Sequence, residues 1–111
     1  MKTMCLFQVY DNVGQTFITN IIPSANRLTA ALGFRNSYIQ EKDPAKNPYA
    51  RAYKALELVE VAVCDVLDNG QFTNFKQSDW TCKGSEIIEL IRDEMAARDV
   101  DDFILDEENE E

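Results

Sequence analysis

Residues 56–67 read LELVEVAVCDVL and form the strongest apolar run of the chain. Every second position in the middle of this run is a valine: Val59, Val61 and Val63. The β-branched content favours a strand over a helix. Since the alternate positions are also largely apolar, we expect a central strand with the three valines in the core. Asn69-Gly70 then signals a hairpin, so residues 71–76 (QFTNFK) are predicted to be the returning strand.

The N-terminal part of the chain predicts a second hairpin. Residues 4–10 (MCLFQVY) and 16–22 (TFITNII) have strand composition, with Cys5, Phe7 and Val9 on one side of the first strand. The residues between them, Asp11-Asn12-Val13-Gly14, have turn chemistry because Asn and Gly tolerate positive φ.

Helical patterns follow each hairpin. Ser24 is a suitable N-cap for a helix over residues 25–34, which Gly33 would help to end. Residues 35–47 are polar and expected to be irregular, and residues 49–55 could form a helical turn or two. Ser85 is expected to cap a second helix through about Arg98, with an apolar row on one face: Ile87, Ile88, Ile91 and Met95.

The order ββαββα predicts an α+β fold, with a small antiparallel sheet of about four strands and the helices on one face. The length of 111 residues fits one domain, which we place at residues 1–98. Residues 99–111 contain eight acids and no base, so we expect a disordered acidic tail. The small core could gain stability from self-association.

Charge is unevenly distributed along the chain. The net charge is −9, but residues 23–56 carry six bases against two acids, or +4, and residues 57–98 carry four bases against nine acids, or −5. The negative net charge argues against nucleic-acid binding, whereas the basic middle of the chain, residues 23–56, permits it.

The residues offer little for catalysis or metal binding. Histidine is absent, so the commonest general base is missing, and no phosphate-binding loop or nucleophile elbow occurs. Cys5, Cys64 and Cys82 are widely separated, which predicts free thiols and neither a disulfide framework nor a zinc site. We therefore expect a non-enzyme without catalytic residues, metal or other cofactor.

The basic middle interleaves cations with aromatic rings, which is what single-stranded DNA requires for phosphate neutralisation and base stacking. The candidate DNA-binding residues are Arg27, Arg35, Tyr38, Lys42, Lys46, Tyr49, Arg51 and Lys54. The alternative is that the rings belong to the core and the cations solvate a loop, and the pattern leaves both open.

The C-terminal tail offers a candidate contact for a protein. An apolar triplet lies among acids there, and the candidate partner-binding residues are Asp102, Phe103, Ile104, Leu105 and Asp106. Such a peptide could dock on a basic, partly apolar groove of another protein, or fold back on the basic segment and compete with phosphates. A purely solubilising terminus is the equal alternative.

Several short motifs carry a family resemblance over roughly residues 4–75. They are Val9-Tyr10-Asp11, Thr16-Phe17-Ile18, Ser24-Ala25, Pro48-Tyr49, the strand Leu56-Glu57-Leu58-Val59, and Gly70-Gln71-Phe72. Together they resemble the nonstructural protein of microviruses, in particular of gokushoviruses. The resemblance implies a non-enzymatic role in the single-stranded DNA stage of a phage.

The expected partners follow from these patterns. They are single-stranded DNA or, alternatively, a basic replication or host protein that the acidic surface engages as an interaction module or DNA-mimicking inhibitor. No run approaches the ~20 apolar residues that a membrane helix needs. The first residues also lack the apolar segment of a secretory signal, so we expect the host cytoplasm.

Overall fold

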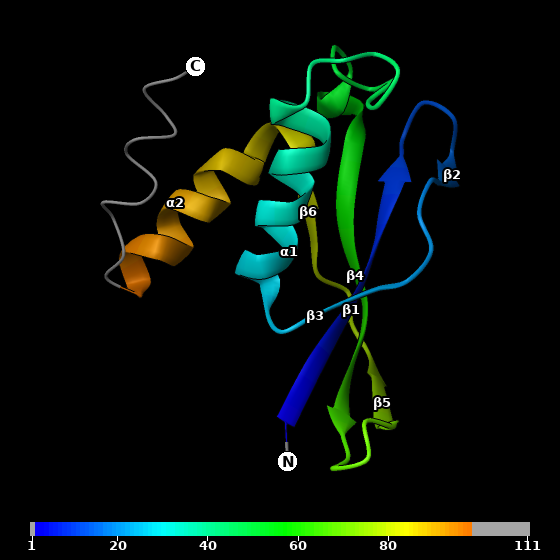
Figure 1. Ribbon diagram of the computed structural model, residues 1–111, viewed down its shortest axis with the longest axis vertical. Helices are drawn as coiled ribbons and strands as arrows, with labels where there is room; N and C mark the ends of the chain where they lie inside the picture. The colour runs from blue at the N-terminus through cyan, green and yellow to red at the C-terminus, as the bar shows by residue number, and fades with distance from the viewer. Residues whose placement is uncertain (1, 99–111) are drawn as a thin grey trace.

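The computed structural model describes residues 2–98. They form an antiparallel sheet with two helices on one of its faces (Figure 1). The elements in chain order are β1 (Lys2–Asp11), β2 (Thr16–Phe17), β3 (Ile22–Ser24), α1 (Arg27–Phe34), β4 (Leu56–Val66), β5 (Phe72–Gln77), β6 (Thr81–Lys83) and α2 (Ile87–Ala97). The predicted α+β class is confirmed. The acidic tail lies outside the described residues.

Two long central strands and two broken edge strands make up the sheet. β1 and β4 pair antiparallel along their whole length. β2 and β3 both pair with β1, while β5 and β6 both pair with β4. The four strands expected from the sequence therefore correspond to four positions in the sheet. The returning strand of each hairpin is interrupted, which raises the strand count to six.

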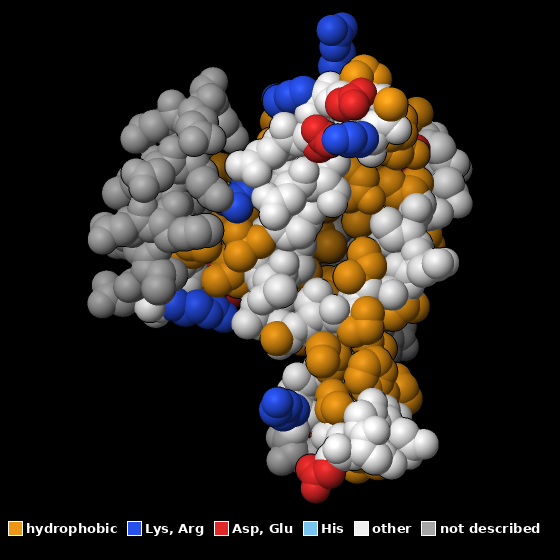
Figure 2. All heavy atoms as spheres, in the orientation of Figure 1, with side chains coloured by type: hydrophobic (Ala, Val, Ile, Leu, Met, Phe, Trp, Pro, Cys, Tyr) orange, Lys and Arg blue, Asp and Glu red, His pale blue; other side chains and the backbone are white. Residues whose placement is uncertain are grey.

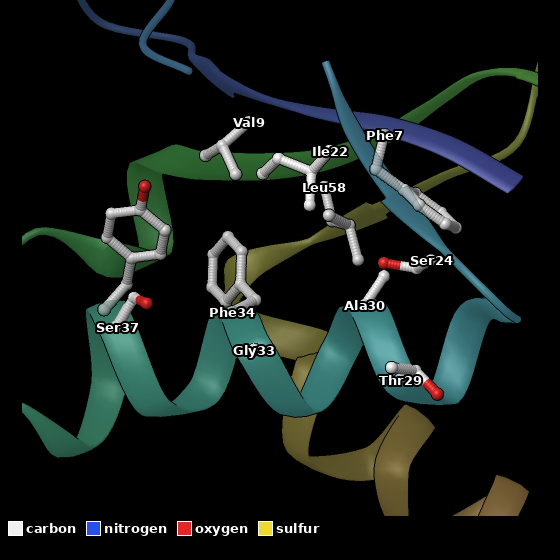
Figure 3. A pocket seen from close by; sticks show the side chains of 11 residues that line it. Phe7, Val9, Ile22, Ser24, Thr29, Ala30, Gly33, Phe34, Ser37 and Leu58 are labelled. Atoms are coloured by element: carbon white, nitrogen blue, oxygen red, sulfur yellow. The ribbon is translucent and has the colours of Figure 1, made fainter. Parts of the chain in front are cut away.

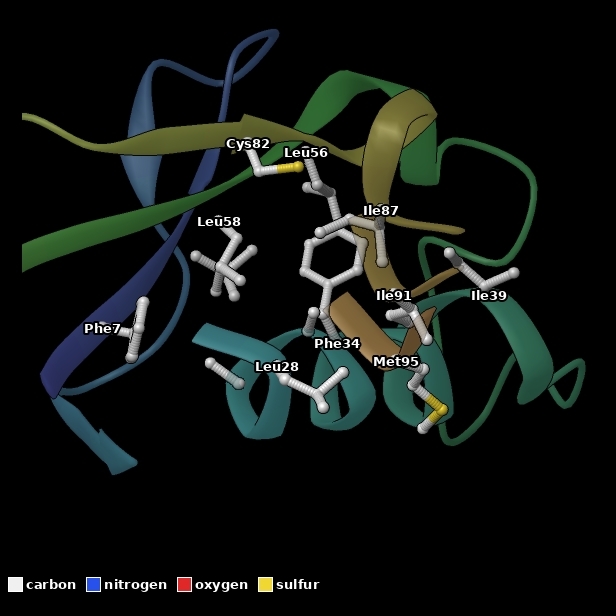
Figure 4. Close-up of a cluster of buried hydrophobic side chains, with 13 residues drawn as sticks. Phe7, Leu28, Phe34, Ile39, Leu56, Leu58, Cys82, Ile87, Ile91 and Met95 are labelled. Atoms are coloured by element: carbon white, nitrogen blue, oxygen red, sulfur yellow. The ribbon is translucent and has the colours of Figure 1, made fainter. Parts of the chain in front are cut away.

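The hydrophobic core lies between the upper half of the sheet and the two helices. Phe7, Val9, Leu56 and Leu58 come from the sheet. In Figure 4, Phe34 points from α1 toward Leu56 and Ile87. α1 also contributes Leu28, Ala30 and Ala31, and α2 contributes Ile87, Ile91 and Met95. Positions four apart recur on one face of a helix, which is why these α2 side chains reach the core together.

The prediction that Val59, Val61 and Val63 form the core face of β4 is wrong. Leu56, Leu58 and Glu60 point toward the helices and are buried, whereas the three valines are only half-buried. The register of β1 against β4 shifts because Leu6 pairs with Ala62 while Phe7 pairs with Glu60. Val61 is thus the extra residue of a β-bulge, and the bulge reverses which side of the sheet later residues face.

The first helix begins later than predicted, at Arg27, and ends at Phe34 as predicted, but a second helical segment follows it directly. Asn26, not Ser24, is its N-cap, and the Asn26 side chain accepts a hydrogen bond from the Thr29 backbone N–H at 2.8 Å. Ser24 instead pairs with Cys5 in the sheet. Gly33 does not end the helix, because the chain continues as a π-helical segment, Arg35–Gln40, in place of the expected irregular structure. Burial of Ile39 stabilises this extension.

The second helix also starts later than predicted. A 3₁₀ turn, Gly84–Glu86, precedes α2, so Ser85 is not the N-cap, and Ile88 is only half-buried. A Cβ at Gly84 would overlap the Tyr53 backbone oxygen, so this close approach requires glycine. Across residues 2–98, no helix is long and apolar enough to cross a membrane.

Candidate nucleic-acid interface

The chain between Glu41 and the start of β4, residues 41–55, forms a loop at the upper end of the sheet (Figure 1). Asn47 is only 1% exposed, and its buried side chain organises this loop. Its Nδ2 donates to the Glu41 backbone oxygen at 2.8 Å, and its Oδ1 accepts from the Tyr49 backbone N–H at 3.0 Å. A buried amide with both ends satisfied holds a defined loop conformation.

The structure brings together two predicted tyrosines that are eleven positions apart in the sequence. The rings of Tyr38 and Tyr49 lie edge to face with centroids 6.3 Å apart, and Tyr38 also packs on Phe34 at 5.0 Å. Burial raises the pKa of Tyr38, and the neighbouring Tyr49 raises it further. Both side chains remain half-buried, so one side of the pair joins the core and the other reaches the surface.

Four predicted cations lie on the same loop as Tyr49. Lys42, Lys46, Arg51 and Lys54 are all exposed, and Figure 2 shows basic side chains projecting at this end of the molecule. Lys46 Nζ lies 3.8 Å from the Glu41 carboxylate, a distance at which an exposed pair contributes little. With Glu41 and Asp43 as its acids, the loop carries four bases against two acids, or +2.

Two of the three predicted arginines, Arg27 and Arg35, do not join this surface. Arg35 is 4% exposed, so in this conformation its side chain is not available to phosphates. Arg27 lies at the start of α1 and makes a two-point ion pair with Glu60, in which Nη2 is 3.0 Å and Nε 3.2 Å from the carboxylate oxygens. Its guanidinium carbon also lies 4.7 Å from the centre of the Trp80 ring.

The buried Glu60 is a feature that sequence reasoning missed. Its side chain is 1% exposed, and besides Arg27 it accepts a 2.6 Å hydrogen bond from Ser78 Oγ. Burial by itself would raise the pKa of Glu60, but the hydrogen bonds from Arg27 and Ser78 outweigh it and hold the pKa below its usual value. The sequence offers little sign of this pair, because Arg27 and Glu60 lie 33 positions apart and only the fold brings them together.

The cluster of Arg27, Glu60 and Ser78 has a structural role. The carboxylate oxygens are engaged by Arg27 and Ser78, and this ties α1 to β4 and to the β5–β6 connection. Burial raises the pKa of the neighbouring Cys5 thiol, and the charge of Glu60 raises it further, which keeps the thiol protonated and weakly nucleophilic. Within residues 2–98, no cluster of three metal-ligating side chains occurs.

An apolar cavity of about 190 Å³ lies between α1 and the β1–β3 side of the sheet. Figure 3 shows Val9, Ile22 and Leu58 extending from the sheet toward Phe34 and Ala30 of α1. Gly33 borders the cavity, and a Cβ there would meet no neighbouring atom. The cavity could not be inferred from the sequence, because it depends on how closely the helix approaches the sheet.

The predicted partner-binding residues, Asp102 to Asp106, lie outside the described part of the chain. Comparisons of the chain with protein-family models, with curated proteins and with solved structures gave no match.

Proposed function

We propose that this chain is a non-enzymatic accessory protein of a single-stranded DNA phage, acting in genome replication or synthesis in the host cytoplasm. It binds single-stranded DNA weakly and with little sequence preference through the loop of residues 41–55. The observation that carries the proposal is that four exposed cations share one loop with Tyr49, whose ring contacts that of Tyr38. Cations would neutralise phosphates, and the exposed side of the tyrosine pair would receive a base.

Two further considerations support the weak, sequence-independent mode. The four cations are exposed side chains on one loop, and three of them are lysines, which lack the rigid planar fork of arginine. The net charge of −9 opposes the approach of DNA over the rest of the molecule. Binding is therefore expected at low salt and to weaken steeply as salt rises.

The test is fluorescence anisotropy with a labelled single-stranded oligonucleotide. Each cation contributes a slope of about 0.7 to the dependence of log K on log salt for single strands. The double substitution Lys42→Gln and Lys46→Gln should therefore reduce the slope by about 1.4 and weaken binding at low salt. Lys76→Gln with Lys83→Gln is the matched control, because both are exposed lysines outside the loop. Absence of binding at low salt, for the full chain and for a chain ending at Arg98, contradicts the proposal.

One observation favours a second function, the engagement of a basic protein. Glu86, Glu89 and Asp93 are exposed and lie three and four positions apart, so they form one acidic row that begins at the N-cap of α2 and continues along the helix. Substituting all three with glutamine should then abolish the capture of a partner from host lysate, and nuclease treatment of the lysate should not. Unchanged DNA binding by that variant would separate the two functions.

A further inference from the structure

The lower half of the sheet extends beyond the helices, and its apolar side chains lie on the face opposite to them. Residues that pair directly share a face of the sheet. Leu6 pairs with Ala62 and Met4 with Cys64, whereas Phe7, on the helix side, pairs with Glu60. Because of the bulge at Val61, the apolar face changes sides below the helices. Figure 2 shows apolar side chains gathered on this lower part of the molecule.

A second bulge adds two phenylalanines to this face. In a regular strand, residues three apart face opposite ways. The register of β5 against β4 shifts between Val63 and Asp65, and Asn74 has a φ of 55°. Phe72 pairs with Val66, which lies on the same side of the sheet as Cys64. Phe75 lies two positions before Gln77, which pairs with Ala62 on that same side. The extra residue therefore places both phenylalanines on the side of Cys64. Phe75 is 60% exposed and Phe72 37%, so two large rings cover the face without being covered themselves.

β5 is also an edge strand. Among residues 2–98 it pairs with β4 and with no strand on its outer side. An open antiparallel edge presents unpaired backbone groups that can accept another strand. Pairing of the same strand in two copies about a two-fold axis is antiparallel and closed, and it places each copy's phenylalanines beside those of the other.

Charge favours a second copy at this end of the molecule. Residues 2–6 and 62–77 contain Lys2 and Lys76 against Asp65 and Asp68, so this region is neutral. The chain as a whole carries −9, with an acidic row along α2, so two copies repel each other at most other approaches. The neutral, apolar end is where two copies can meet at little electrostatic cost.

We propose that the chain forms a two-fold homodimer through β5 and the apolar face around Phe72 and Phe75. A whole phenylalanine side chain offers about 200 Å², and the exposed fractions of Phe72 and Phe75 together amount to nearly one such side chain. The exposed aromatic surface is therefore about 200 Å² per copy. A standard interface buries about 800 Å² per partner, and the two rings supply about a quarter of that area, so we expect a weak dimer. This interface lies at the opposite end of the sheet from the residue 41–55 loop and leaves that loop free in both copies (Figure 1).

Sedimentation equilibrium over about 5 to 500 µM tests the proposal. The mass of the full chain should rise from 12.7 kDa toward twice that value. Phe75→Ser should weaken association at least about tenfold, because a central aromatic anchor is lost. Its melting curve should stay close to that of the wild type, since Phe75 is largely exposed. Val13→Ser is the matched control: Val13 is 82% exposed in the first hairpin loop, outside the proposed interface.

Amide hydrogen exchange gives a second readout, because exchange in residues 72–77 should slow as concentration rises. A wild-type chain that stays monomeric to the highest concentration overturns the proposal and leaves the face to a different protein. Equal weakening by Val13→Ser and Phe75→Ser also overturns it, as does a Phe75→Ser chain that dimerises as well as the wild type.

Discussion

Substituting Arg27 with methionine tests the buried Glu60 cluster. The Arg27 side chain is 43% exposed but that of Glu60 only 1%, so the two partners are not equivalent. Arg27→Met leaves a carboxylate buried without its counter-charge, a change that costs about 3–5 kcal/mol in buried pairs. Since Ser78 still donates to the carboxylate, we expect a loss near the lower limit, about 3 kcal/mol of unfolding free energy.

Substituting the other partner, Glu60, should cost less unfolding free energy. Glu60→Leu removes the buried charge, and Arg27 can turn its exposed guanidinium to water, so we expect a loss of about 1 kcal/mol. Arg27→Lys keeps the charge but loses the two-point geometry and should fall between the two variants. It also keeps the comparison informative if Arg27→Met does not fold.

The effect of Arg27→Met should depend on pH with a defined sign. In the wild type the pKa of Glu60 is lowered in the folded state, so its stabilisation is present above the unfolded value of about 4.3 and is lost as pH falls through the folded value. Without Arg27, burial should raise that pKa above the unfolded value. The deficit of the variant should therefore be full at pH 7 and shrink toward pH 4.

Urea unfolding followed by far-ultraviolet circular dichroism at both pH values provides the measurement. This signal is preferable to fluorescence, because Arg27 contacts Trp80 directly. A variant within about 0.5 kcal/mol of wild type at pH 7 would refute the reasoning. So would a deficit of the same size at pH 4 and pH 7, or a larger loss for Glu60→Leu than for Arg27→Met.

Two further predictions concern β4 and the thiols. Leu58 is 2% exposed under the helices, so Leu58→Ala should cost about 2–5 kcal/mol in urea unfolding, whereas Val59→Ala, at a half-buried position, should cost under about 1 kcal/mol; equal losses would contradict the assignment of faces. Burial, with Glu86 and Glu57 nearby, raises the pKa of Cys82 to about 11, so at pH 8 native Cys82 should react with iodoacetamide roughly 100-fold more slowly than in urea, and peptide mapping that finds fast native labelling would contradict this.

Much of the architecture could be predicted from the sequence because its signals are local. Alternation of apolar residues and β-branched content located the central strand β4. Asn69-Gly70 located the second hairpin, where Gly70 has a φ of 87°. The apolar row of α2 reflects helical periodicity, and Ile87, Ile91 and Met95 are buried as predicted. The α+β class follows from the order of these elements alone.

The candidate site could be predicted only in part. The sequence places cations and rings in residues 27–54, but contact and exposure depend on the tertiary structure. Tyr38 meets Tyr49 because Asn47 shapes the loop between them. Arg27 is drawn to Glu60, 33 positions away, and Arg35 is buried, so neither extends the cationic surface of the loop. Binding to DNA stays a prediction.

The tertiary structure also decided which residues of β4 form the core. Alternation identifies two faces of a strand but not which one the helices cover, and a bulge exchanges the faces along the way. The bulge at Val61 places Leu58 and Cys64 on opposite sides of the sheet, although their spacing in the sequence indicates the same side. A bulge depends on pairing between strands distant in sequence. The apolar pattern of one strand therefore indicates that the strand is buried. Only its pairing with other strands determines which of its side chains pack against the helices.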